Sequence, residues 1–458
     1  MKDFTSTYNS LNKFISLIDI KDFRCLFNPF FWPIEKYMGT TEGSLVFNPE
    51  QNKKNYIFTL KILLRHVKNN IFLLWQNMLK KKWERTVVHG FIREDTDYIV
   101  YTWLKKEEIT AFIREKQSPY IGDLIPKLEI QKKVQPLIHI TNPSKLEKKD
   151  VALLTDNNCI VIGINSFLPL NSFFIAFKIS IPIAFNIFLK FKNYYWTHLF
   201  FISIFNHKFI LSLAIFDHLK KMIGHCNLKL ILTWEGQPEQ RAVCAAFRDN
   251  GMLTYGYIQS SLITNPCFVS KINSSVLQKA FPNQLFHHGS DYYESLIKVG
   301  WDRQDIIYIK SLRYKQKEKS YFEGCLYLPY SVKSYKHALY ILSEEQINFE
   351  IKIARIKMHP DHSQKLEIQS MSKNIKLDYT SKNIFVVGFS TVIFEALEAG
   401  CEHVYQIILD SSNYIDPTLY PSLIQQNINN KVIQYSLKNS CKGSLISFDN
   451  TNTIYGFI

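Results

Sequence analysis

The sequence lacks several features that would assign it to a common class of protein. Glycine and proline are modest in number, with 16 of each among 458 residues, and no internal repeat or low-complexity tract is present. The 8 cysteines form no C-x-x-C pair. With 46% hydrophobic and 21% charged residues, the composition excludes a disordered or fibrous chain and a small disulfide-bonded scaffold. It indicates a globular protein with reduced, mostly buried thiols.

Two kinds of ligand-binding motif are also missing. Glycine-rich phosphate loops of the Walker or dinucleotide type are absent, which argues against an ATPase or a dehydrogenase. The histidine pairs His359 with His362 and His287 with His288 have no cysteine or carboxylate to complete a metal set, and Pro360 argues against the first pair sharing one helix face. We therefore expect no metal ion and no cofactor.

Long uninterrupted apolar runs are rare, and the two longest carry polar interruptions. Residues 166–191 contain Lys178 and Pro182, and residues 196–216 contain the Asn-His-Lys sequence 206–208. A charge or a proline near the middle makes a spanning helix costly. We expect core or interfacial helices here, and peripheral contact with an anionic membrane is open because aromatic residues flank the basic ones.

The start of the chain offers no targeting signal, because no apolar run follows a positively charged segment in residues 1–9. A cytoplasmic location is expected, peripheral on the inner face of the cytoplasmic membrane if the interfacial helices bind lipid.

Positive charge is in excess, with 55 Lys and Arg against 40 Asp and Glu and a formal charge of +15. Such a surface favours anionic partners, among them nucleic acid, anionic lipid and sugar nucleotides. The basic residues are scattered, and no nucleic-acid-binding module is recognisable, so no nucleic-acid partner is expected. A solvated basic surface without a specific partner is the open alternative.

From residue 228 onward, short apolar strands alternate with amphipathic helices, which is typical of α/β units with a parallel sheet. The pattern predicts strands at 228–233 and 253–258 with a helix at 238–250 between them. After a polar, Lys-rich linker at 311–320 it predicts further strands at 325–332, 349–358, 383–387 and 403–408, with helices at 335–343 and 391–399. The length suggests two domains, which we place at residues 1–310 and 321–458.

Polar residues follow three of these predicted strands. Glu235 follows the first, His359 follows the strand that ends at 358, and Ser390 and Thr391 follow the strand at 383–387, after Gly388. Ligands of open α/β sheets bind at the carboxyl ends of strands, so these residues are expected to converge.

Each of these residues has a chemical role and an ordinary alternative. A carboxylate can act as general base, a histidine can assist a leaving phosphate, and hydroxyls with free N–H groups at a helix start can bind phosphate. Taken singly, the hydroxyl pair could be an N-cap, His359 a turn residue, and Glu235 and Glu239 carboxylates favoured by a helix dipole.

The joint pattern resembles bacterial sialyltransferases and the Kdo transferases of surface-polysaccharide assembly. It comprises an acidic-Gly motif at Glu235-Gly236, a His-Pro motif at His359-Pro360 and the Ser390-Thr391 pair. The resemblance extends over residues 228–405. In related surface-carbohydrate transferases the second strand ends in Gly-Tyr-Gln-His, whereas this chain has Gly-Tyr-Ile-Gln at 256–259. Either Gln259 performs the role that the histidine has in those transferases, or this chain lacks that role.

The resemblance implies a GT-B fold, in which two Rossmann-like domains enclose a cleft. It assigns the acceptor, a glycan or lipid-linked glycan of capsule or lipopolysaccharide, to the basic and aromatic N-terminal domain, and the nucleotide-sugar donor to the C-terminal domain. It implies transfer of a nonulosonate or Kdo from its CMP ester without a metal.

The resemblance also implies roles for individual residues. Glu235 would act as the general base, and His359 would assist the departure of the phosphate. Ser390 and Thr391 would hold the phosphate. Glu395 matches a glutamate that meets the donor ribose, with an exposed helix carboxylate as the alternative. Further candidates for contact with the donor phosphate or the turns around it are Gly236, Gly388, Pro360, Lys357, Arg313 and Glu239.

Two other functions remain open at this stage. A polyol-phosphate transferase of the teichoic-acid type also uses histidines and a Ser/Thr helix start, but with a CDP-activated donor. A non-catalytic scaffold of polysaccharide assembly would keep the fold without the chemistry, and the glutamine at position 259 is compatible with it.

Overall fold

The computed structural model describes part of the chain in detail. The described residues are 15–16, 20–28, 68, 86–140, 146–163, 170–191, 200, 203–204, 206–224, 227–260, 270–272, 274–328, 354–357, 378–388, 390–408, 415, 417–438, 441–448 and 454. The predicted helix at 335–343 and most of the predicted strand at 349–358 lie outside them, as do His359 and Pro360.

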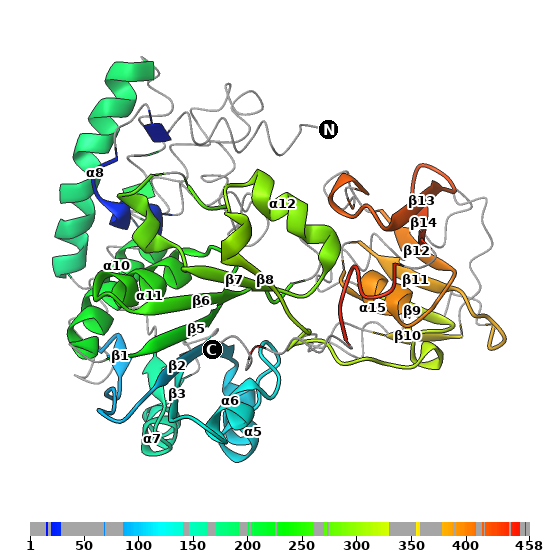
Figure 1. Cartoon of the computed structure of the whole chain (residues 1–458), viewed down its shortest axis with the longest axis horizontal. Coiled ribbons are helices and arrows are strands. Elements are labelled where there is room, and N and C mark those ends of the chain that lie inside the picture. Colours follow the sequence, from blue (N-terminus) through cyan, green and yellow to red (C-terminus); the bar gives the residue numbers. More distant parts are fainter. Residues whose placement is uncertain are drawn as a thin grey trace. The chain divides into compact units, whose positions relative to one another are not determined.

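The chain divides into two compact units, each with its own sheet. The first comprises Met1–Gln259, Asn265–Phe286 and Leu296–Ile307, and the second comprises Ser260–Thr264, His287–Ser295 and Tyr308–Ile458. Both sheets are dominated by parallel strands (Figure 1). The chain is therefore an α/β protein with two Rossmann-like units, as the sequence predicts.

An eight-stranded sheet, built mainly from the first unit, has the order β1-β4-β3-β2-β5-β6-β7-β8 among the described residues. Its strands are β1 Val88–His89, β2 Tyr98–Leu104, β3 Val134–Ile140, β4 Ile160–Ile162, β5 Lys229–Thr233, β6 Leu253–Tyr257, β7 Gln284–His287 and β8 Ile306–Tyr308. Strands β4, β3, β2, β5, β6 and β7 pair in parallel, and β1 pairs antiparallel with β4. Every residue of β2 is buried, as expected of a parallel sheet covered on both faces.

The strand order places a topological switch point between β2 and β5. Counted from β2, the order β4-β3-β2-β5-β6-β7 is the doubly wound 3-2-1-4-5-6 pattern, in which ligands bind at the carboxyl ends of the strands where the order reverses. In the first unit this point lies just beyond Leu104 of β2 and Thr233 of β5.

Helices connect these strands (Figure 1). They are η1 Phe23–Phe27, η4 Lys106–Glu108, α5 Ile109–Glu115, α6 Leu124–Glu129, α7 Lys148–Asp156, α8 Leu170–Phe191, α10 His207–Ile223, α11 Pro238–Asp249, η7 Leu277–Ala280, η8 Ser290–Tyr292, α12 Tyr293–Lys298 and η9 Arg303–Asp305. Helix α11 packs on α10 and on strands β5 and β6. Pro238 occupies its first turn, and Gly251, with φ +78°, follows its end.

The second unit contains a six-stranded sheet with the order β10-β9-β11-β12-β14-β13. Its elements are η10 Lys319–Tyr321, β9 Cys325–Tyr327, β10 Arg355–Lys357, β11 Ile384–Val387, α15 Val392–Glu398, β12 Val404–Ile407, η13 Pro417–Leu419, β13 Leu423–Asn427 and β14 Val432–Leu437. The first four strands of that order pair in parallel, and β14 and β13 extend the sheet antiparallel. Here the strand order reverses between β9 and β11.

Several described elements after residue 227 match the predicted pattern, whereas β7, α12, β8, β13 and β14 were not predicted. The strands predicted at 228–233, 253–258, 383–387 and 403–408 are β5, β6, β11 and β12, and the predicted helices at 238–250 and 391–399 are α11 and α15. Of the six cysteines described, five are buried and Cys441 is intermediate, and all six are free thiols. The prediction of mostly buried, reduced cysteines is confirmed for these residues.

Candidate functional site

Glu235 lies at the switch point of the first unit, in the turn that joins β5 to α11. Gly236 provides the turn with φ +68°, a conformation that favours glycine. The backbone N–H of Glu235 donates a 2.8 Å hydrogen bond to the Gln240 side-chain oxygen, and the N–H of Gln237 donates to the same oxygen at 3.2 Å. The start of α11 therefore fixes the backbone on both sides of Gly236.

Both oxygens of the Glu235 carboxylate accept hydrogen bonds from side-chain amides. Gln259 Nε2 donates to Oε1 at 2.7 Å, and Gln237 Nε2 donates to Oε2 at 3.0 Å. Gln259 follows β6, the strand beside β5, and is only 2% exposed. An amide cannot take up or release a proton at neutral pH, so Gln259 does not replace a histidine as acid or base. It orients the carboxylate.

A cluster of aromatic and imidazole groups lies near the carboxyl ends of β2 and β3, and the sequence analysis missed it. The Tyr101 hydroxyl lies 2.7 Å from His139 Nδ1, and Trp103 Nε1 lies 2.9 Å from that hydroxyl and 3.2 Å from Nδ1. Trp103 and His139 are paired across β2 and β3. We call Tyr101, Trp103 and His139 the strand-end triad.

The hydrogen bonds of the strand-end triad assign the proton of His139. An indole N–H can only donate, so Trp103 donates to the Tyr101 oxygen, and the Tyr101 hydroxyl donates to Nδ1. Burial lowers the pKa of His139 to about 4 and raises that of Tyr101 well above its ordinary value. At neutral pH His139 is therefore neutral, with its proton on Nε2, where it serves as a hydrogen-bond donor.

Glu239, in the first turn of α11, faces the strand-end triad. Burial raises the pKa of Tyr101, and the negative charge of Glu239 raises it further. For His139, burial lowers the pKa, and the charge of Glu239 offsets part of that decrease. The carboxylate is 5% exposed and lies 3.7 Å from Lys208 Nζ. Glu239 is thus a buried, ion-paired group and not a solvated residue placed by the helix dipole alone.

Three buried oxygens of this region have no hydrogen-bond partner within the described part of the chain, Thr233 Oγ1, Glu239 Oε2 and Gln259 Oε1. The last two belong to side chains next to Glu235 or the strand-end triad. Buried polar atoms are nearly always bonded, so both mark positions where a ligand hydroxyl would be stabilised. The first unit therefore brings Glu235, Glu239 and Gln259 to one end of its sheet, together with the strand-end triad.

The predicted donor-side residues lie in the second unit, near its switch point between β9 and β11. Gly388 follows β11 with φ +70°, and its carbonyl accepts a 2.8 Å hydrogen bond from Gln406. Ser390 and Thr391 precede α15. Ser390 Oγ accepts from the Val392 N–H at 3.4 Å, and the Thr391 side chain makes no cap hydrogen bond. The N-cap interpretation therefore describes Ser390 only weakly and Thr391 not at all.

Glu395 is buried in α15, so the alternative of an exposed helix carboxylate is wrong. It is 9% exposed and accepts a 2.9 Å hydrogen bond from Lys317 Nζ, which lies in the predicted linker. The positive charge of Lys317, 78 residues earlier in the sequence, offsets the negative charge of Glu395.

Lys357 and Arg313 interact with aromatic rings. The Lys357 ammonium lies 3.4 Å from the Tyr321 ring centroid and donates to the Tyr321 carbonyl at 2.8 Å, and burial lowers its pKa. The Arg313 guanidinium lies 5.2 Å from the Tyr314 ring centroid. Their roles as phosphate partners stay predictions, as do those of His359 and Pro360 outside the described residues.

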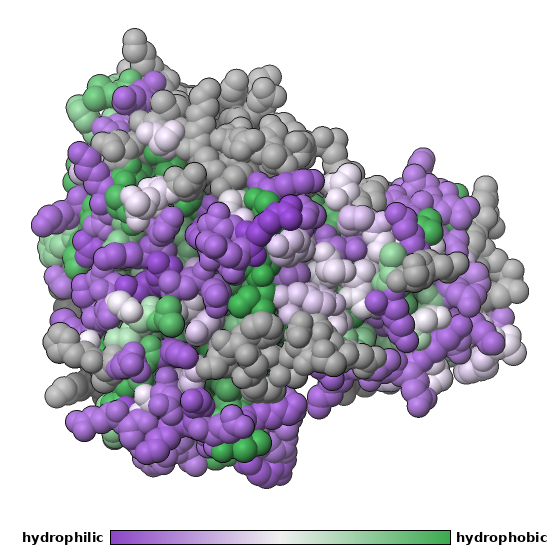
Figure 2. All heavy atoms as spheres, in the orientation of Figure 1, coloured by the Kyte–Doolittle hydropathy of each residue, from purple (hydrophilic) through white to green (hydrophobic). Residues whose placement is uncertain are grey.

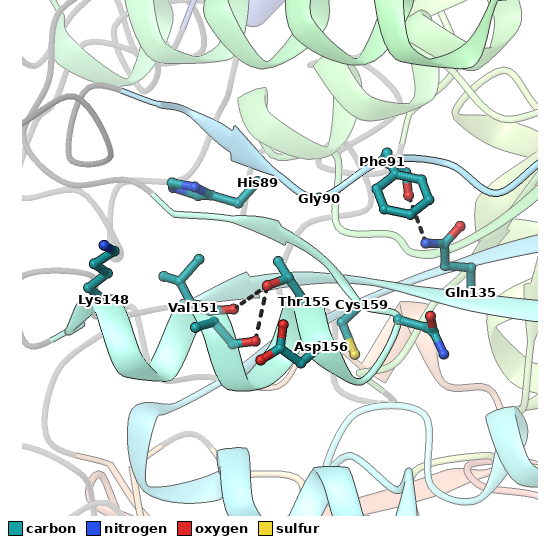
Figure 3. Close-up of a pocket in the computed structure, with 11 residues that line it drawn as sticks. His89, Gly90, Phe91, Gln135, Lys148, Val151, Thr155, Asp156 and Cys159 are labelled. Carbon is teal, nitrogen blue, oxygen red and sulfur yellow. Dashed lines mark hydrogen bonds between the residues drawn. The ribbon is translucent and has the colours of Figure 1, made fainter.

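A cavity of about 400 Å³ lies elsewhere in the first unit (Figure 3). It is lined by α7, by β1 and the two residues after it, by Gln135 at the start of β3 and by the segment before β4, which includes Cys159. These positions lie at the amino ends of the parallel strands, opposite to the edge where α/β sheets bind ligands. The Thr155 hydroxyl in its wall donates to backbone carbonyls of α7. None of the predicted site residues lines this cavity.

Comparison with known proteins leaves the family open. No family model matches the chain, and no curated protein matches it. Among solved structures, it is similar to S. aureus MnaA in complex with UDP, with 11% identity, a TM-score of 0.31, and coverage of 66% of this chain and 76% of that one.

Two further solved structures are UDP-GlcNAc 2-epimerases. The enzyme from Neisseria meningitidis bound to UDP-GlcNAc has 12% identity and a TM-score of 0.31, and the match covers 67% of this chain and 81% of that one. Another UDP-N-acetylglucosamine 2-epimerase has 9% identity and a TM-score of 0.33. The match covers 68% of this chain and 78% of that one. Because all these TM-scores are low, we base no functional conclusion on them.

Proposed function

We propose that this chain is a glycosyltransferase that moves a sugar, a nonulosonate or Kdo, from a CMP-activated donor to a hydroxyl of a capsule or lipopolysaccharide glycan. The observation that carries the proposal is the Glu235 carboxylate at the switch point of the first unit, with both oxygens held by the amides of Gln259 and Gln237. A carboxylate oriented in this way can serve as a general base toward one hydroxyl.

The groups around Glu235 support an acceptor site in the first unit. His139 offers Nε2–H as a donor, and Glu239 and Gln259 each have a buried oxygen that lacks a hydrogen bond within the described residues. A sugar carries several hydroxyls that donate and accept at once, so it can satisfy groups of both kinds.

The proposed reaction is a direct transfer of the sugar to an acceptor hydroxyl. Glu235 removes the proton of the acceptor hydroxyl, whose oxygen attacks the anomeric carbon while the bond from that carbon to the CMP phosphate oxygen breaks. The resemblance assigns His359 to the departing phosphate, and Ser390 and Thr391 to its oxygens. Glu395 would meet the ribose, and the step needs no metal. CMP and the extended glycan are the products.

The test is a transfer assay in which CMP release from CMP-Kdo and CMP-sialic acid is measured in the presence of bacterial surface glycans. Glu235→Gln removes the base and keeps the size of the side chain, and we expect turnover to fall by about 10² to 10⁴-fold. Glu115→Gln, at the exposed end of α5, is the matched control and should leave turnover unchanged.

Nucleotide binding is measured on the same proteins by thermal shift with CMP, CDP, UDP, GDP and ADP, since a ligand that binds only the folded state raises its stability. Glu235→Gln should keep the CMP-induced shift, because Glu235 lies in the other unit from the proposed donor residues. A preference for CDP with release of CMP would favour the polyol-phosphate transferase. Absence of any nucleotide shift would refute the transferase and favour the scaffold.

A further inference from the structure

Helix α8 presents an apolar stripe to solvent, interrupted once by Lys178. Five of its large hydrophobic side chains are between 53% and 68% exposed, namely Leu170, Phe174, Ile181, Phe185 and Leu189. Their spacing of four, seven, four and four residues places them on one face of the helix. Figure 2 shows hydrophobic side chains at the outer edge of the molecule where the upper part of α8 lies in Figure 1.

The opposite face of α8 is buried in the first unit. Ala176, Ile183 and Ile187 are at most 8% exposed, and the helix packs on α10 and η1. Within the described residues, α8 is the one helix long and apolar enough to cross a membrane by length and composition. Because α8 buries one face against its own domain, which is not a bundle of spanning helices, we expect it to lie along a surface.

The exposed face carries positive charge only. Lys178 is exposed on the same side as the stripe, Lys190 is exposed at the end of the helix, and α8 contains no Asp or Glu. Lysines can extend their ammonium groups toward lipid phosphates while their alkyl chains stay beside apolar neighbours. The chain as a whole has a formal charge of +15, which adds long-range attraction to an anionic surface.

The area of the stripe argues against a second copy of the chain as its occupant. At roughly 150–250 Å² for a whole large side chain, five side chains exposed to this extent offer on the order of 500 Å². A standard stable protein interface takes roughly 800 Å² from each partner. A narrow apolar stripe on a helix whose charged residues are all lysines instead matches the depth to which an interfacial helix enters the boundary between headgroups and acyl chains.

We propose that α8 docks the protein on an anionic membrane surface, with the stripe from Leu170 to Leu189 inserted below the headgroups and Lys178 and Lys190 bound to lipid phosphates. This inference stands apart from the proposed glycosyl transfer, because it rests on α8 alone and does not involve Glu235. It would hold for a catalytic protein and for a scaffold.

The experiment is flotation of the purified full-length protein with vesicles of phosphatidylcholine, with or without phosphatidylglycerol. We expect partitioning onto the anionic vesicles, weakened by salt, and little onto the neutral ones. Phe174→Glu with Phe185→Glu should lower the partition coefficient at least tenfold. Lys178→Glu with Lys190→Glu should lower it by more than the roughly fivefold that one lysine near an anionic surface contributes.

Matched controls come from exposed positions elsewhere in the first unit. Ile130→Glu, at a side chain 78% exposed, and Lys132→Glu should leave partitioning unchanged. All four altered α8 side chains are exposed, so the variants should keep the wild-type melting temperature. Binding that survives both α8 variants, or no binding of the wild type, would overturn the proposal. So would a wild-type dimer that the α8 variants convert to monomer.

Discussion

The Gln259 side-chain amide donates a 2.7 Å hydrogen bond to the Glu235 carboxylate across the ends of β5 and β6. Gln259 occupies the position where the surface-carbohydrate transferases that the sequence resembles have a histidine. Since its amide has no proton to exchange at neutral pH, the bond makes it a positioning residue for Glu235. The glutamine at this position is therefore compatible with the proposed role of Glu235 as general base.

Gln259→Leu should reduce turnover by roughly tenfold or more, because the Glu235 carboxylate loses one of the two amides that orient it. KM for the donor should stay unchanged, because Gln259 belongs to the first unit and the proposed donor residues to the second. Steady-state kinetics of CMP release separate the two parameters.

Gln131→Leu, at an exposed position after α6, controls for the loss of a surface amide and should behave as wild type. Gln259→Glu, which places a second carboxylate beside Glu235, should be at least as damaging as the leucine variant. Equal loss of turnover in Gln131→Leu and Gln259→Leu would contradict the positioning role.

Tyr101→Phe should destabilise the first unit by about 1–2 kcal/mol, because it removes the hydroxyl that links Trp103 to His139 and leaves buried polar atoms with poorer partners. Urea denaturation followed by tryptophan fluorescence measures the effect, since Trp103 and Trp234 are buried in this unit. Tyr379→Phe, at a residue 79% exposed, should change stability by less than about 0.5 kcal/mol.

A double-mutant cycle of Tyr101→Phe with His139→Leu should show a coupling energy of about 1 kcal/mol, since the two side chains share a hydrogen bond. Additive effects would mean that the Tyr101 hydroxyl and Nδ1 of His139 do not interact in solution.

The parts of the fold that were predictable are those encoded locally. A strand that ends at Thr233, a helix opened by Pro238 and a glycine after its end are each specified by neighbouring residues, so β5, α11 and β6 were predicted to within about a residue. The strand-end triad could not be predicted in this way. His139 meets Trp103 only because β3 pairs with β2 in one register, and nothing within either strand specifies that register.

The burial of charged residues could not be predicted from the sequence either. Glu395 reads as a surface carboxylate in a short helix, and its partner Lys317 lies 78 residues earlier. Glu239 reads as a residue favoured by the helix dipole, whereas its burial depends on β2, β3 and α10 together. Such contacts depend on tertiary packing, which the helical pattern of either segment does not specify.

Stability should fall as the pH drops from about 6.5 toward 4. Burial lowers the pKa of His139 and of His287 to about 4 from the ordinary value of 6.5. In this window the unfolded chain binds protons that the folded chain does not, so each histidine lowers the free energy of unfolding by about 1.4 kcal/mol per pH unit. Above about pH 6.5 both contributions are fully present.

Denaturation curves at pH 7, 6 and 5 measure this slope. His139→Gln should flatten it for the first unit and His287→Gln for the second, whereas His403→Gln, at an exposed residue, should leave it unchanged. A wild-type slope equal to that of the two buried-histidine variants would show that these imidazoles titrate normally in the folded state.

Glu395 and Lys317 form an ion pair at 2.9 Å, so substitution of Glu395 alone cannot separate donor binding from loss of that pair. Glu395→Gln should abolish most of the CMP-induced thermal shift if the carboxylate binds the ribose. Lys317→Met breaks the same pair from the other side and should lower the melting temperature of the free protein. It should still permit a shift with CMP, because the carboxylate remains. Thermal shift across a CMP titration measures both quantities for each variant. If Lys317→Met and Glu395→Gln lose the shift equally, the pair acts as a structural link and the ribose role of Glu395 is wrong.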